Sequence, residues 1–108
     1  MKITPTEIKV KLNRPDGMNF HHYLIEIARH WDSYIKIIIP DRLTQELMKY
    51  NFQTVGEKLS IFLFKGYPTF TMKINHSERL TLNVIFSNYP LPAHLLDIDY
   101  KIKDGLTL

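Results

Sequence analysis

The feature that most constrains the fold is a change in the spacing of apolar residues near Lys58. Beyond it, apolar side chains recur at every second position, as in strands with one buried face. Two such runs stand out: Phe70, Met72, Ile74 and then Leu80, Leu82, Val84, Phe86. Residues 59–64 are apolar on both sides, which is typical of a central strand. We therefore predict an antiparallel meander of three strands, with hairpin connections at 65–68 and 75–78.

The first half of the chain shows helical and strand patterns in turn. Residues 6–12 alternate and predict a half-buried strand, and residues 34–39 predict a short β-branched strand that Pro40 ends. Between them, Phe20, Leu24, Ile27 and Trp31 recur at helical spacing and predict a helix over 18–31, with Asp16 as its N-cap. A second helix is expected from Asp41 to Gly56, with a buried stripe of Leu43, Leu47 and Tyr50.

These elements together predict an α+β fold. Two helices are expected to pack on one face of a mixed sheet of five to six strands, in the order strand, helix, strand, helix and then three strands. Pro92 is expected to start one helical turn, and the alternation of Ile98, Tyr100 and Ile102 predicts a final edge strand. A chain of 108 residues forms one domain, 1–108.

Composition excludes several classes of protein. An apolar share of 44% and a charged share of 23% are those of an ordinary globular domain and argue against disorder. The absence of Cys excludes disulfides, thiolate zinc sites and cysteine nucleophiles. The start of the chain lacks the apolar stretch of a secretory signal, and no segment is apolar enough to span a membrane. We expect a cytoplasmic protein, and abundant Ile, Lys and Asn are typical of bacterial or phage genomes rich in AT.

Two clusters of histidines and carboxylates are candidate enzyme sites. His22, Glu26 and His30 follow one another at every fourth residue of the first helix, on the face opposite its apolar stripe. His22 and His30 would lie about 12 Å apart along that helix, so one metal ion cannot join them without distortion. His94, Asp97 and Asp99 form a second cluster, whose two aspartates would point the same way on a strand.

Neither cluster carries a known catalytic signature. No Gly-x-Ser-x-Gly elbow and no glycine-rich phosphate loop is present. We therefore expect no metal and no cofactor, and a small enzyme that depends on His and carboxylates is the third hypothesis.

Nucleic-acid binding is the second hypothesis. The net charge is +3, and its basic residues gather near the N-terminus. Lys9 and Lys11 share the solvent side of the first strand, with Arg14 after it and Lys73 on the open face of the meander. These four residues would contact phosphates.

Protein binding is the first hypothesis. Exposed apolar residues beside charged ones suit the anchors of an interface. On the first helix these are Met18, His22, Ile25, Glu26 and Arg29. The chain is thus expected to be a non-catalytic adaptor, inhibitor or immunity-type module that occupies a partner's surface. Phe52 and the Tyr67–Pro68 turn are further exposed candidates, and a homodimer through an edge strand is a further expectation.

Overall fold

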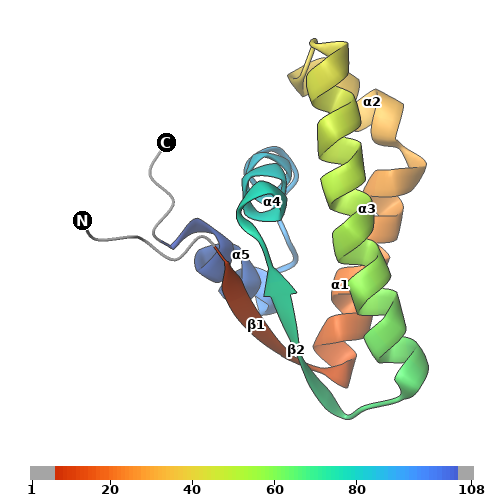
Figure 1. The fold of residues 1–108 in the computed structure, drawn as a ribbon, viewed down its shortest axis with the longest axis vertical. Coiled ribbons are helices and arrows are strands. Elements are labelled where there is room, and N and C mark those ends of the chain that lie inside the picture. The colour runs from red at the N-terminus through yellow and green to blue at the C-terminus, as the bar shows by residue number, and fades with distance from the viewer. Residues whose placement is uncertain (1–6, 105–108) are drawn as a thin grey trace.

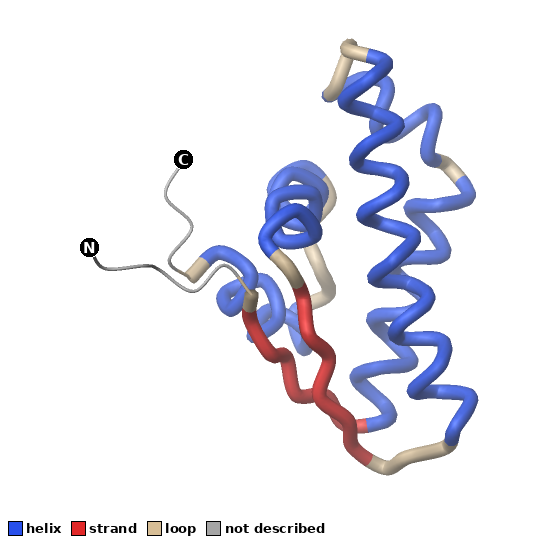
Figure 2. Tube along the Cα trace, in the orientation of Figure 1, coloured by secondary structure: helices blue, strands red, loops and turns tan. Residues whose placement is uncertain are grey.

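A computed structural model describes residues 7–104 of the chain. Its helices pack against one face of a two-stranded ribbon, as Figures 1 and 2 show. The elements in chain order are β1 (Ile8–Asn13), α1 (Arg14–Arg29), α2 (Trp31–Ile38), α3 (Arg42–Lys65), β2 (Thr69–Ile74), α4 (His76–Asn88), the 3₁₀ turn η1 (Ala93–Leu95) and α5 (Leu96–Lys103). The α1 and α2 helices run beside α3, and α4 and α5 lie on the other side of the molecule (Figure 1).

The expected five- to six-stranded sheet is wrong. Among the described residues the only sheet has two strands, β1 and β2, and they pair directly and antiparallel. Four of the expected strands are helical: residues 34–39 fall mostly in α2, 59–64 in α3, 80–86 in α4 and 98–102 in α5. Figure 2 shows strand confined to one ribbon. The fold is therefore mainly helical.

The two strands that do form confirm the period-two pattern. Val10 and Leu12 of β1, and Phe70, Met72 and Ile74 of β2, are buried on one face, while the residues between them are exposed. Ile8 pairs with Ile74 and Leu12 pairs with Phe70 across the ribbon. Because each strand has one apolar face, the ribbon covers the core with one side and meets solvent with the other.

Residues 76–88 form a helix because their first turn satisfies its own donors. The Asn75 side chain accepts from the backbone N–H of Glu78 at 2.8 Å, and the Glu78 carboxylate accepts from the backbone N–H of Asn75 at 2.9 Å. This reciprocal capping box stabilises a helix start at the place where a hairpin turn was expected. Leu82 and Phe86 are both buried, since residues four apart share a face in a helix as well as in a strand.

The same ambiguity explains α2 and α5. Trp31 and Ile35 of α2 are buried four residues apart, and so are Ile98 and Ile102 of α5. The residue between the last two decides the matter, because Tyr100 is 66% exposed where an alternating strand would bury it. The helical turn expected after Pro92 is confirmed by η1.

The α3 helix does not stop at Gly56. It continues to Lys65 and ends where Gly66 adopts a left-handed conformation, with φ of 74°. Asp41 is its N-cap, as expected, and accepts from the backbone N–H of Thr44. The expected buried stripe is wrong: Leu43, Leu47 and Tyr50 are 79%, 61% and 65% exposed.

The buried face of α3 lies on its other side. It is formed by Met48, Asn51, Phe52, Val55 and Leu59. Phe52, expected at the surface, is buried and stacks on Trp31 with ring centroids 5.3 Å apart. The expected stripe is wrong because α3 has two apolar faces, and within residues 7–104 only one of them packs against the other elements.

The first helix is confirmed. Phe20, Leu24, Ile27 and Trp31 are all buried, although Trp31 begins α2 after a break at His30. The N-cap is Asn13 instead of Asp16, since the Asn13 side chain accepts from the backbone N–H of Asp16 at 2.8 Å. The helix thus begins directly where β1 ends.

Among the described residues, no helix has the length and apolarity that crossing a bilayer requires.

Candidate functional site

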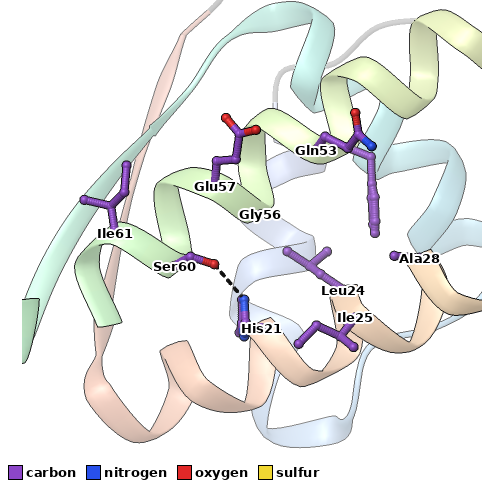
Figure 3. A pocket seen from close by; sticks show the side chains of 10 residues that line it. His21, Leu24, Ile25, Ala28, Gln53, Gly56, Glu57, Ser60 and Ile61 are labelled. Carbon is purple, nitrogen blue, oxygen red and sulfur yellow. Dashed lines mark hydrogen bonds between the residues drawn. The ribbon is translucent and has the colours of Figure 1, made fainter. Parts of the chain in front are cut away.

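A groove runs between α1 and α3 on the surface of the molecule. Its larger hollow has a volume of about 640 Å³. Leu24, Ile25 and Ala28 of α1 form one wall, and Gly56 and Ile61 of α3 lie on the other. Figure 3 shows Leu24 between the two helices, whereas Ile61 projects from the outer side of α3. A concave surface with mostly apolar walls and a few polar groups is the usual form of a binding site.

A second hollow of about 330 Å³ continues the groove toward the start of α1. His21 and Ser60 line both hollows, and their side chains are hydrogen-bonded across the groove at 2.9 Å (Figure 3). Met18 of α1 and Phe64 of α3, 45% and 93% exposed, flank this lower part. The two hollows together are called the α1–α3 groove below.

The groove gathers part of the predicted protein-binding set. Met18, His22 and Ile25 line it, as a contact on the first helix requires. Glu26 and Arg29 do not line it. Both are exposed on α1, and Glu26 lies 3.3 Å from His30 in an i,i+4 pair.

Sequence reasoning missed the α3 wall of the groove. Gln53, Gly56, Glu57, Ser60 and Ile61 lie there, and the strand expected at 59–64 hid the last two from view. One signal was present in the sequence. Alternating steps of four and three residues from Leu43 reach Leu47, Tyr50, Ile61 and Phe64, with the polar Thr54 and Glu57 between them. Apolar residues at this spacing on both sides of Gly56 indicate one continuous helix.

The predicted nucleic-acid set is partly brought together. Lys9 lies directly opposite Lys73 in the ribbon, Lys11 opposes Thr71, and all three lysines are exposed on the same face. This set of Lys9, Lys11 and Lys73 is called the basic ribbon face. Arg14 is elsewhere: it is half-buried at the lower end of the α1–α3 groove and donates to the Leu63 carbonyl at 3.1 Å.

The two enzyme candidates do not converge. Within residues 7–104, no group of three His, Asp or Glu side chains is arranged to hold a metal ion. Glu26 pairs with His30, which lies about two helical turns beyond His22, so the three side chains do not meet at one point. The expectation that Asp97 and Asp99 point the same way is wrong, because on a helix two residues apart diverge by about 200°.

The aspartates of α5 accordingly have different surroundings. Asp97 lines a small hollow with His94. The Asp99 side chain is 13% exposed and lies 3.2 Å from the Lys103 ammonium. Tyr23 of α1 donates to the Tyr89 carbonyl, and its burial, with a further contribution from the Asp99 charge, raises its pKa above the ordinary value for tyrosine. The Tyr23 hydrogen bond joins α1 to the end of α4, and the Asp99–Lys103 pair lies within α5.

The His21 side chain in the groove makes the free energy of unfolding of the protein depend on pH. Burial, and secondarily the neighbouring His22, lower the pKa of His21 below its ordinary 6.5. The unfolded chain therefore binds this proton more readily than the folded one, so the free energy of unfolding falls as pH drops below about 6.5. We expect His21→Gln to make this loss shallower in urea unfolding curves recorded between about pH 8 and pH 5.

The matched control for this titration is His94→Gln, an exposed histidine outside the groove. An equally steep loss of stability in the His21→Gln protein would show that other groups cause it.

The chain was compared with family models, with curated proteins and with solved structures. It matches no family model, no curated protein and no solved structure. The function is therefore inferred from the geometry of the α1–α3 groove and the basic ribbon face.

Proposed function

We propose that the chain is a small, non-catalytic protein-binding module that acts by occupying a surface of its partner. The α1–α3 groove is its contact, and an amphipathic helix of the partner is the ligand that fits it. The proposal includes the cytoplasm as its location. It rests on one observation above all: two helices expose apolar side chains on both sides of one open groove.

The dimensions and chemistry of the groove support this ligand. Helical ligands insert apolar residues at positions i, i+3 or i+4 and i+7 into such grooves. The Leu24, Ile25 and Ile61 side chains offer apolar contacts in the larger hollow, and Met18 and Phe64 do so in the lower one. Glu57 beside the groove and Arg14 at its foot offer charges to a polar rim, as at other protein interfaces.

Gly56 provides a sharp test of the groove. A Cβ added there meets nothing within 4 Å, so a side chain at this position projects into open space. Random peptides displayed on phage are selected on the immobilised protein, and synthetic copies are titrated calorimetrically. We expect apolar residues at helical spacing in the selected peptides, and Gly56→Leu should raise their Kd at least about tenfold by filling the groove.

The matched control is Gly56→Ala. It adds one methyl group and should leave the Kd within about threefold, while the better helix propensity of alanine raises the free energy of unfolding by about 1 kcal/mol. The double variant Ile25→Asp, Arg29→Glu should raise the Kd of the peptides and leave the thermal unfolding temperature of the protein nearly unchanged. Peptides that bind the Gly56→Leu protein as tightly as the native one would overturn the groove as the contact.

A second candidate function, nucleic-acid binding, is favoured by the basic ribbon face. Like charges directly opposite one another weaken a strand pair, yet Lys9 faces Lys73 here. A bound phosphate backbone would relieve that repulsion. A two-stranded ribbon also has the width that the DNA major groove admits.

This candidate is tested by fluorescence anisotropy of labelled duplex DNA, single-stranded DNA and RNA at several salt concentrations. Each phosphate neutralised steepens the log–log salt slope by about 0.7–0.9. We expect Lys9→Glu with Lys11→Glu to flatten the slope by about two such steps. An unchanged slope, or no binding at low salt, would remove the ribbon from consideration.

A further inference from the structure

One face of α3 carries a regular stripe whose apolar residues the rest of the described chain leaves mostly exposed, while Thr54 within it is half-buried and donates to Glu78 of α4. Its positions follow steps of 4, 3, 4, 3, 4 and 3 residues: Leu43, Leu47, Tyr50, Thr54, Glu57, Ile61 and Phe64. These seven residues are called the α3 seam. Five of them are apolar, and each of those five is at least 53% exposed. Such spacing, sustained over three heptads, is typical of a helix that pairs with another helix.

The seam lies opposite the face of α3 that joins the core. At 100° per residue the seven positions fall within an arc of about 100°, whereas Met48, Phe52, Val55 and Leu59 lie on the other side. A helix that is apolar on two opposite faces is stable when both are covered. Within the described residues only one of them is covered.

The pattern of the seam favours a second copy of the same helix in antiparallel orientation. Parallel pairing sets every residue against itself, so two Glu57 carboxylates would meet in the middle of an apolar stripe, which is unfavourable. Antiparallel pairing sets d positions against a positions. One register then places Leu47 against Phe64, Tyr50 against Ile61, and the two polar residues Thr54 and Glu57 against each other at the centre.

The flanking residues agree with this register. Antiparallel helices bring like flanks together, so Lys65 comes beside Thr44 on one side, whereas Asn51 and Lys58 of that flank bind Thr81 and Glu78 within their own chain. On the other side Gln53 comes beside Ser60. The residues paired in this way carry no like charges, so nothing in the register opposes association.

The exposed area is near what a specific dimer needs. A large side chain presents roughly 150–250 Å² when fully exposed, so the four that pair in this register, Leu47, Tyr50, Ile61 and Phe64, bury roughly 400–700 Å² per chain. Two copies bury about 800–1,400 Å² from these residues alone, a range that includes the lower limit for specific complexes. A reversible dimer with a Kd in the micromolar range fits that area.

We propose that two copies of the chain associate through the α3 seam, with their α3 helices antiparallel. Leu47 and Tyr50 of the exposed stripe then pack against the second copy, while Leu43 lies beyond the end of the partner's α3 helix. The seam shares Glu57, Ile61 and Phe64 with the α1–α3 groove, so a second copy and the proposed ligand of the groove would compete for these side chains.

Sedimentation equilibrium over a concentration series tests the association. The native mass should rise from one chain of 12.8 kDa toward two with concentration. Tyr50→Glu should raise the dimer Kd at least a hundredfold, because it places a carboxylate against Ile61. The matched control is Ile37→Glu, which alters an apolar residue of α2 that is 79% exposed and lies outside the seam, and it should not change the Kd.

The absence of native Cys allows the orientation to be tested directly. Purified Leu47→Cys and Phe64→Cys proteins are mixed under mild oxidation with a glutathione couple. Antiparallel pairing predicts mainly the mixed disulfide between the two variants. Parallel pairing predicts that each variant cross-links to itself, and that outcome would overturn the proposed orientation.

Failure of this proposal is separable from failure of the groove. A native chain that stays monomeric at millimolar concentration would overturn association through the α3 seam. A dimer that Tyr50→Glu leaves intact would overturn it too, and would point instead to pairing through an edge strand of the ribbon. The selected peptides are titrated into the monomeric Tyr50→Glu protein. Tight binding there supports the groove whatever the seam does.

Discussion

Glu78→Ala is expected to lower the free energy of unfolding by about 3 kcal/mol, one of the two largest effects of a single polar substitution that the fold suggests. The Glu78 side chain is 1% exposed. Its carboxylate accepts from the Lys58 ammonium at 2.8 Å, from the Thr54 hydroxyl at 2.6 Å and from the backbone N–H of Asn75 at 2.9 Å. Alanine leaves these donors without their acceptor and removes half of the capping box of α4.

Urea unfolding followed by circular dichroism measures the loss. The matched control is Glu46→Ala, an exposed carboxylate on α3, which should change stability by less than about 0.5 kcal/mol. Lys58→Met tests the pair from its other side, and the double variant Lys58→Met, Glu78→Ala should cost less than the sum of the single ones. Additive losses would show that the ion pair between α3 and α4 is not what stabilises this junction.

The same residue explains one of the strands that the sequence wrongly indicated. Alternating apolar residues at 80–86 and 98–102 fit a strand, but alternate members of each run lie four residues apart and fit a helix equally well. At 80–86 local polar chemistry decides between the two, whereas α2 and α5 begin without a side-chain cap. At 75–78 the capping box fixes a helix start, whereas β1 and β2 have no such cap and keep their period of two.

The helix predicted around Phe20 and Leu24 is confirmed because α1 has one apolar face, and its spacing fits a helix but not a strand. The stripe of Leu43, Leu47 and Tyr50 was misassigned for a different reason. A helix with two apolar faces gives no indication of which face meets its own chain, and only packing against α1 and α4 selects Phe52 and Val55. Tertiary structure, instead of local propensity, made that choice.

The candidate site was half predictable for the same reason. Met18, His22 and Ile25 were found because α1 was recognised as a helix. The opposite wall was not, since it depends on α3 continuing past Gly56. Of the basic residues, Lys9 and Lys73 were brought together because period two puts them on one face, but Arg14 begins a helix and turns to the Leu63 carbonyl.

Arg79→Ala is the second large effect, with an expected loss of about 3 kcal/mol in the free energy of unfolding. Arg79 of α4 is 2% exposed, and its guanidinium donates to the carbonyl of Ile102 at 2.9 Å and to that of Asp104. These carbonyls belong to the end of α5, where helix C-termini carry unpaired acceptors and a partial negative charge. The buried cation therefore holds α5 against α4, and alanine should release it.

Two further variants separate charge from packing at this position. Arg79→Lys keeps the charge but cannot donate to both carbonyls with a planar fork, so it should recover only part of the stability. Arg79→Met keeps the aliphatic volume and removes the cost of burying a charge. Hydrogen exchange at the backbone N–H groups of Ile102 and Asp104 should quicken far more than that of Met72 in β2. Uniform quickening of all three would instead mean that Arg79 supports the whole core, because α5 then has no separate anchor to lose.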